Sequence, residues 1–295
     1  MQDVKRGFKR KTIIEAIENK LSEWYATLPE ELVAELRLNV IVTGGAIPSM
    51  LLGDLPNDYD VYLVDKDVCE KLVNHYLKKY VKSEKVSEIE TRHNSTGGVQ
   101  IYVKSSGVLT DRENQNDYRY FESLPPEEAE KFFKNREYAK SSDKPKYTPQ
   151  MITSNAISLD GDIQIVTRFC GTPADIHTNF DFLHATSWYC NGELEFKHLD
   201  LVLARELRYQ GSKYPICALF RLKKFLRRGW TITAGEILKI AWDINKLDLT
   251  DIAVLQDQLT GVDAAYFNQV LAELRAEEKD LDRTYLFELV NRVFN

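Results

Sequence analysis

VTGGAIPSMLLGDLPNDYDVY, residues 42–62, is the stretch that decides the fold of this 295-residue chain. It follows an apolar, β-branched run over residues 38–43, which predicts a buried strand. Gly44 and Gly45 end that strand, and residues 46–52 have the length of a short helix, which Gly53 closes. A second apolar run begins with Asp58 and Asp60. We therefore expect a strand, a glycine turn, a short helix and a second strand.

The glycines and aspartates of this stretch indicate a specific chemistry. A phosphate can approach Gly44 and Gly45 closely because they lack a Cβ, and the free N–H groups of the following helix, which carries Ser49, point toward it. Asp58 and Asp60 stand at i and i+2 of a strand, so both carboxylates leave one face. Such a pair suits Mg²⁺, and two ions about 3.5–4 Å apart suit an in-line displacement at phosphorus. The alternative is a strand–turn–helix with two surface aspartates.

The stretch resembles the head of the tRNA CCA-adding enzymes and bacterial poly(A) polymerases, in the polymerase-β-like nucleotidyltransferase superfamily. That family shows Gly-Gly-x-Val-Arg-Asp-x-Leu-Leu-Gly, then a proline, then Asp-x-Asp. The residues in register are Gly44, Gly45, Leu51, Leu52, Gly53, Asp58 and Asp60, and a looser match runs to about residue 230. The resemblance implies that Gly44 and Gly45 hold a triphosphate and that Asp58 and Asp60 hold two Mg²⁺ ions.

The chain also departs from the family pattern. Pro48 and Ser49 replace an Arg-Asp pair, so one phosphate-binding arginine is missing. The third carboxylate of the family falls at Gln164, in a strand expected over 162–168, and glutamine is a neutral, poorer metal ligand. Asp162 and Asp181 are possible substitutes, and Asp181 also occupies the place of the aspartate in the family's Arg-Arg-Asp-Phe. The motif that reads the base edge should fall at residues 213–217, where only its proline is kept.

Further phosphate-binding candidates are basic. Arg168 shares a strand face with Gln164, and Arg221, Lys224 and Arg228 form one face of a helix expected over 215–228. Residues 205–230 contain eight basic residues and one acidic residue, although the chain as a whole carries a net charge of −6. Such a cluster of basic residues is compatible with a surface that faces RNA or a triphosphate. An outward Arg168 and a solvated basic helix face are equally good interpretations.

The remaining pattern divides the chain in two. We predict an α+β fold with a mixed-sheet nucleotidyltransferase head over residues 1–185, carrying an insertion at about 105–150, and an all-helical neck and body over 186–295. A hairpin is expected over 152–169, turning at Asp160 and Gly161 in a type I′ turn. Helices are expected over 198–209 and from a capping box at Thr233 and Glu236.

The cysteines and histidines bear on the cellular compartment and on the kinds of site that the chain can form. The widely spaced cysteines (Cys69, Cys170, Cys190 and Cys217) indicate reduced thiols in a cytoplasmic protein, and no apolar run is long enough to span a membrane. His177 and His184 indicate loop and core roles rather than a zinc site. Residues 209–213 superficially resemble a phosphate loop but lack its glycine spacing.

These observations favour a metal-dependent nucleotidyltransferase. It would move a nucleotide from an NTP, ATP or CTP, to the 3′ end of an RNA, with a tRNA-like acceptor favoured. One alternative keeps the chemistry but uses a protein or small-molecule acceptor, which the net acidity and the missing base-reading motif favour. The other is a non-catalytic NTP- or RNA-binding relative, which the neutral Gln164 favours.

Overall fold

A computed structural model describes residues 7–81, 88–94, 97–104, 147–152 and 155–249, together with 251, 254 and 258. The described residues belong to two compact units, which are treated separately: one runs to residue 121 and resumes over 145–206, and the other comprises 122–144 and 207–295. The insertion expected at about 105–150 lies outside the described residues except at its edges. The domain boundary expected after residue 185 stays a prediction. The compact unit that contains the sheet runs on to Glu206.

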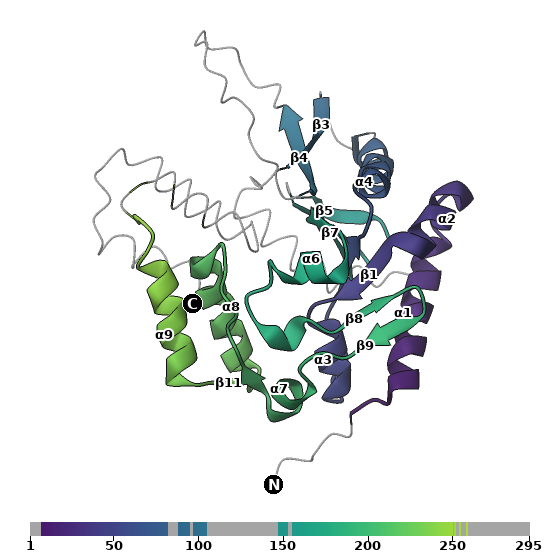
Figure 1. The fold of residues 1–295 in the computed structure, drawn as a ribbon. Coiled ribbons are helices and arrows are strands. Elements are labelled where there is room, and N and C mark those ends of the chain that lie inside the picture. The colour runs from purple at the N-terminus through teal and green to yellow at the C-terminus, as the bar shows by residue number, and fades with distance from the viewer. Residues whose placement is uncertain are drawn as a thin grey trace. The chain divides into compact units, whose positions relative to one another are not determined.

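The first unit is a mixed α+β structure built on a seven-stranded sheet in the order β5-β6-β7-β2-β1-β8-β9 (Figure 1). Its strands are β1 (Val40–Thr43), β2 (Tyr59–Leu63), β5 (Pro149–Ile152), β6 (Ala156–Leu159), β7 (Ile163–Cys170), β8 (Trp188–Cys190) and β9 (Glu193–Glu195). The sheet is mixed because β2 and β7 run parallel, whereas the neighbouring pairs are antiparallel. A separate hairpin pairs β3 (Glu88–His93) with β4 (Val99–Lys104).

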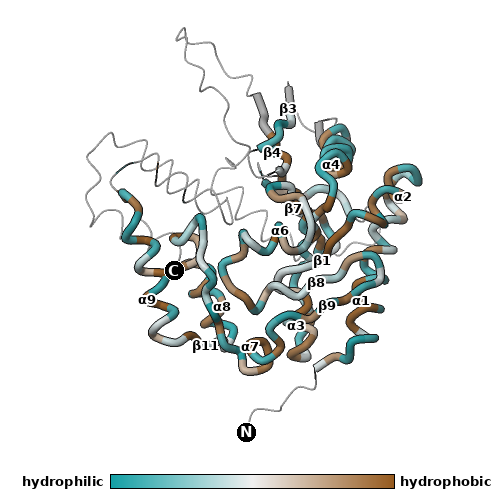
Figure 2. The backbone as a smooth tube through the Cα atoms, in the orientation of Figure 1, coloured by the Kyte–Doolittle hydropathy of each residue, from teal (hydrophilic) through white to brown (hydrophobic). Residues whose placement is uncertain are grey.

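Helices cover both faces of this sheet. They are α1 (Arg10–Tyr25), α2 (Glu30–Asn39), α3 (Ala46–Leu51), α4 (Lys66–Val81), α6 (Pro173–His177), the 3₁₀ helix η1 (Leu183–Ala185) and α7 (Leu199–Ala204). One face, with Val42 and Val61, forms the main core with apolar residues of α1 to α4. The opposite face, with Ile41 and Tyr62, packs against Ile176 of α6. Figure 2 shows that α1 and α4 carry both hydrophobic and hydrophilic residues, as helices covering one face of a sheet should.

The second unit contains α8 (Pro215–Arg227) and α9 (Ala234–Ile244), which pack against each other. A short ladder pairs β10 (Glu206–Leu207), at the boundary between the two units, with β11 (Thr231–Ile232), and the sequence pattern did not predict it. Helices expected beyond residue 258 lie outside the described residues. No helix in the described ranges combines the length and the apolar character needed to cross a membrane.

Three local predictions need correction. The hairpin of β6 and β7 forms, but the left-handed residues of its turn are Gly161 and Asp162, at φ +94° and +62°, rather than Asp160 and Gly161. The helix expected over 198–209 ends at Ala204, because Arg205 has φ +51° and the chain then enters β10. Thr233 precedes α9 without a side-chain cap, because the carboxylate of Glu236 accepts hydrogen bonds from Tyr209 and Lys239 instead.

Candidate active site

A row of polar side chains crosses four strands beside the quoted stretch. Strand register pairs Thr43 of β1 with Asp60 of β2, Asp60 with Gln164 of β7, and Gln164 with Ser158 of β6. Paired residues of neighbouring strands lie about 4.8 Å apart and send their side chains to the same face. We call Thr43, Asp60, Gln164 and Ser158 the polar row. It lies on the same face as Ile41 and Tyr62, opposite the main core.

Gly44 shapes the space next to this row. Its φ of +86° is a left-handed conformation, and a Cβ on it would lie 2.4 Å from Oδ2 of Asp60. Any other residue would therefore be strained and would displace the carboxylate. The N–H of Gly44 donates to the carbonyl of Ala185 at 3.1 Å, whereas Gly45 is exposed, with nothing within 4 Å of the place of its Cβ. Gly45 is thus the glycine that leaves room for an incoming group.

The two aspartates differ in their surroundings. Asp60 is half-buried within β2, whereas Asp58 is exposed one residue before the strand begins. Tyr59 between them is buried in the main core, as strand alternation requires. Gln164 stands beside Asp60 in the sheet, and carboxylate and amide oxygens are hard donors of the kind that Mg²⁺ prefers. Within the described ranges, no cluster of three or more His, Cys, Asp or Glu side chains has the geometry of a metal site.

Buried hydrogen bonds fix the end of β1 beneath the glycines. The hydroxyl of Thr43 donates to the carbonyl of Ser187 at 2.8 Å and lies 2.9 Å from Nε2 of His177. The hydroxyl of Thr43 has a single proton, which it donates to Ser187. The neutral imidazole of His177 is therefore assigned its proton on Nε2, from which it donates to the oxygen of Thr43. Burial, with a contribution from the charge of Lys197, lowers the pKa of His177 to about 4. The imidazole is therefore neutral near pH 7 and acts as a fixed donor.

The short helix α3 is held at both of its ends. The hydroxyl of Ser49 donates to the carbonyl of Gly45 at 2.8 Å, so its proton is used inside the helix. After the helix, the N–H of Asp54 donates to the carbonyl of Ser49 at 2.9 Å. The carboxylate of Asp54 then meets the guanidinium of Arg205 at 3.3 Å, just past the end of α7. These contacts fix the path from Gly45 to the strand that carries Asp60.

The predicted site residues fall at different distances from the row. Gln164 stands directly beside Asp60. Asp162 lies in the hairpin turn, where its carbonyl accepts from the N–H of Tyr59 at 2.8 Å. Arg168 lies four positions beyond Gln164 on β7, about 13 Å along an extended strand, with its guanidinium 5.5 Å from the ring centroid of Phe169.

The other predicted residues lie off the sheet. Asp181 is buried, at 4% exposure, in the segment between α6 and η1, and η1 supplies the Ala185 carbonyl that accepts from Gly44. Arg221 and Lys224 of α8, and Arg228 at its C-terminal cap, belong to the second unit. Within the first unit, the structure brings together Gly44, Asp60 and Gln164.

Sequence reasoning missed three members of this arrangement. Thr43 and Ser158 are short polar residues in otherwise apolar strands, and this polarity was the available indication. His177 ends α6, a helix whose capping box of Thr172 and Asp175 is visible in the sequence. The contact between His177 and Thr43 joins segments 134 residues apart, so local pattern did not reveal it.

The strand–glycine–helix–strand path, the mixed sheet and the carboxylates beside a left-handed glycine define a protein with a nucleotidyltransferase-like head followed by a helical part. Residues 15–203, well over half of the chain, match the sequence model of Gad2, the Gabija anti-defense 2 family. The chain belongs to this family. A curated relative, "Gabija anti-defense 2" of Bacillus phage SPbetaL7, is 23% identical over 302 aligned positions, which cover 94% of this chain and 58% of the relative. The chain thus spans less than two thirds of that relative's length.

Solved structures that this chain matches include tRNA-processing enzymes. The apo form I of a CCA-adding enzyme is 14% identical, with a TM-score of 0.41 over 85% of this chain and 49% of that enzyme. A tRNA-processing enzyme, also in apo form I, is 12% identical, with a TM-score of 0.39 over 94% of this chain and 57% of that enzyme.

Proposed function

We propose that this chain is a metal-dependent nucleotidyltransferase of the polymerase-β-like superfamily. The observation that carries the proposal is the contact between Gly44 and Asp60, next to the exposed Gly45 and Asp58. Asp58 and Asp60 would hold two Mg²⁺ ions, with Gln164 at the third position, and Gly45 would leave space for the triphosphate of ATP or CTP. The ions would neutralise charge on the phosphates when bound.

The reaction is a displacement at the α-phosphorus of the NTP. The oxygen of an acceptor hydroxyl forms a bond to that phosphorus, the bond to the bridging oxygen breaks, pyrophosphate leaves, and the hydroxyl proton passes to solvent. Side chains that are held in place before the reaction lower its barrier by positioning the reactants and by stabilising charge. These two effects account for most of the catalysis of phosphoryl transfer. Gln164 remains neutral and accepts no proton, so the charge of the site depends on Asp58 and Asp60 alone.

The acceptor class proposed first is an RNA 3′ end of the tRNA type. The basic run over residues 205–230 favours it, because a polyanion needs cationic partners. A second candidate is a protein acceptor. The name of the family, Gabija anti-defense 2, favours that candidate, because a modified component of the opposed system would explain such a name. The net charge of −6 also favours a protein acceptor over generic RNA.

Pyrophosphate release measures the chemistry without knowledge of the acceptor. Each of the four NTPs, labelled at the α-phosphate, is incubated with Mg²⁺ and either bulk tRNA or a bacterial protein extract. We expect release of pyrophosphate and label in one macromolecular fraction, which identifies the acceptor class. Replacing both acids, Asp58→Asn with Asp60→Asn, should reduce release by about a hundredfold or more, since charge stabilisation at such sites is worth several kcal/mol.

A matched control separates chemistry from folding. Asp67→Asn removes an exposed carboxylate from the first turn of α4, in the same unit but outside the polar row, and should leave release unchanged. Equal thermal midpoints for all variants would exclude unfolding as the cause. Release that is the same in the native chain and the double variant would contradict the proposal and favour a non-catalytic NTP- or RNA-binding protein.

A further inference from the structure

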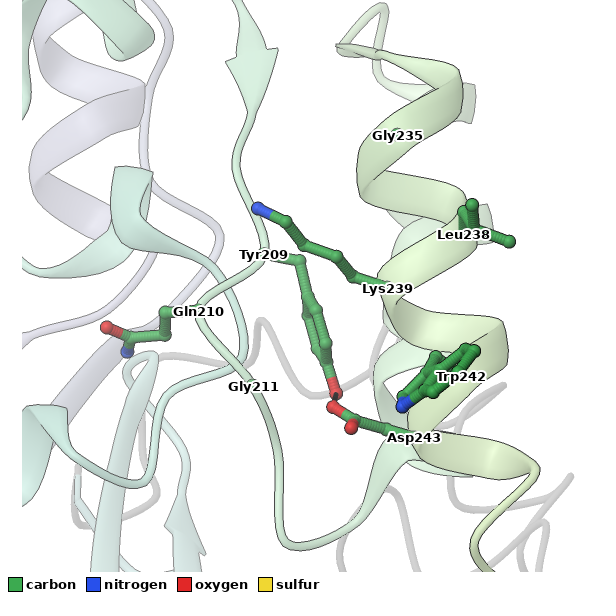
Figure 3. Close-up of a pocket in the computed structure, with 8 residues that line it drawn as sticks. All are labelled: Tyr209, Gln210, Gly211, Gly235, Leu238, Lys239, Trp242 and Asp243. Atoms are coloured by element: carbon green, nitrogen blue, oxygen red, sulfur yellow. Dashed lines mark hydrogen bonds between the residues drawn. The ribbon is translucent and has the colours of Figure 1, made fainter.

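The second unit contains a pocket of about 470 Å³ between the segment 209–211 and helix α9 (Figure 3). Its lining residues are Tyr209, Gln210, Gly211, Gly235, Leu238, Lys239, Trp242 and Asp243. The volume is within the range of sites that take a drug-sized molecule. None of these residues belongs to the proposed catalytic site.

Two hydrogen bonds fix the inner wall of this pocket. The hydroxyl of Tyr209 donates to Oδ2 of Asp243 at 3.0 Å, and the N–H of Tyr209 donates to Oε2 of Glu236 at 2.8 Å. Figure 3 shows the ring of Tyr209 extending from the segment toward α9 to reach Asp243. Tyr209 is only 3% exposed. The segment and the helix are therefore held at a set separation before any ligand arrives.

The wall of the pocket that α9 forms presents an aromatic side chain to solvent. Trp242 is 68% exposed, although burial of an indole is strongly favourable. Gly211 and Gly235 add to the open space, because no heavy atom lies within 4 Å of the place where either would carry a Cβ. A flat group can therefore lie against Trp242 without moving the wall.

The charges in the pocket are balanced. Glu236 pairs with Lys239 at 2.7 Å, and Asp243 pairs with Lys246 at 2.7 Å. Such a pocket does not select an anion or a cation. It suits a neutral planar ring with both donors and acceptors on its edge, because the carboxylate of Asp243 and the ammonium of Lys239 offer both kinds of partner.

Cationic side chains occur on the neighbouring helix of the same unit. Lys224 and Arg227 of α8 and Arg228 after it are exposed, and α8 packs against α9. A stacking aromatic combined with a basic surface is the usual arrangement for single-stranded nucleic acid, in which bases stack and phosphates meet cations. We propose that this pocket binds an unpaired nucleobase of a single-stranded RNA, stacked on Trp242, with the RNA backbone following α8.

This binding goes beyond the proposed transfer reaction, because it requires neither metal nor NTP. It is measured by fluorescence anisotropy of a labelled single-stranded RNA 12-mer, in EDTA and without NTP, using the full chain. Trp242→Ala should weaken binding by about tenfold or more, whereas Trp242→Phe should lose less, because a smaller ring still stacks. A duplex of the same sequence should compete poorly, because its bases are not available.

A second variant guards against misfolding. Gly235→Leu places a good helix former in α9 and fills the open space, so binding should fall while thermal stability is kept. Ile237→Ala, a neighbouring exposed residue that does not line the pocket, should bind as the native chain does. The variant with Asp58→Asn and Asp60→Asn should also bind normally, which separates this inference from the proposed catalysis.

Three results would overturn the inference. The first is native affinity in both Trp242→Ala and Gly235→Leu, and the second is no binding by the native chain. The third is self-association of the native chain in sedimentation, abolished by Trp242→Ala without any change in RNA binding. The exposed face of α9 would then be a contact between two copies of the chain.

Discussion

Gly44 and Asp60 lie so close that a methyl group on the glycine would stand 2.4 Å from the aspartate Oδ2. The glycine also has a φ of +86°, which disfavours any L side chain. Gly44→Ala should therefore lower the free energy of unfolding by about 1–2 kcal/mol for the backbone alone, and by more if Asp60 has no room to move. Urea denaturation at pH 7 measures the change.

Gly45→Ala is the matched comparison. Gly45 has φ −77° and open space at the position of its Cβ, so its unfolding free energy should change by no more than about 0.5 kcal/mol. If the triphosphate lies against Gly45, the added methyl group should raise the KM for NTP while stability is kept. An equal loss of stability in both variants would show that the contact between Gly44 and Asp60 is not the constraint.

Gln164→Glu tests the third position of the metal site. Gln164 pairs with Asp60 in the parallel register of β2 and β7, so a glutamate there would add a carboxylate to the polar row. One added charge near a divalent ion contributes about 1–4 kcal/mol, so Mn²⁺ or Mg²⁺ should bind about tenfold more tightly or better. Isothermal titration with metal alone measures this, and Gln164→Leu provides the apolar comparison. Unchanged affinity in Gln164→Glu would place the metals elsewhere.

The sequence predicted the local path of the head well, because its features are local. Gly44 and Gly53 mark turns by their left-handed conformation, and Asp58 and Asp60 alternate with core residues, so neighbouring positions contain the information. The resemblance placed Gln164 at the third carboxylate position of the family, and the parallel register of β2 and β7 sets Gln164 beside Asp60. The hairpin of β6 and β7 was recognised by its turn, although the left-handed residues are Gly161 and Asp162.

Contacts between distant segments were not predictable in this way. The bond between Thr43 and His177 and the ion pair of Asp54 with Arg205 depend on how α6 and α7 return to the sheet. The early end of α7 likewise depends on Arg205 adopting φ +51°. Local secondary-structure propensity does not determine contacts between segments that are far apart in the sequence.

Thr43→Val tests the buried network under the glycine turn. The valine has a similar shape but removes the hydroxyl that bonds Ser187 and His177, leaving a carbonyl and an imidazole N–H without that partner. The unfolding free energy should fall by about 1–3 kcal/mol. Thr43→Ser keeps the hydroxyl and loses one methyl group, so it should cost about 1 kcal/mol. If serine and valine prove equally destabilising, the methyl group rather than the hydroxyl is what matters at this position.

His184 should make the head less stable in mild acid. Burial lowers its pKa from about 6.5 to about 3, so the unfolded chain takes up a proton that the folded chain refuses. The contribution of neutral His184 to the free energy of unfolding is therefore fully present above pH 6.5. It falls by about 1.4 kcal/mol per pH unit as the pH drops toward 3. His177, with a pKa lowered to about 4, acts in the same direction. Denaturant titrations between pH 7 and 5, where the carboxylates stay ionised, compare the native chain with His184→Gln. The variant should be less stable at every pH but should show a flatter slope, and an unchanged slope would mean that His184 is protonated in the folded protein.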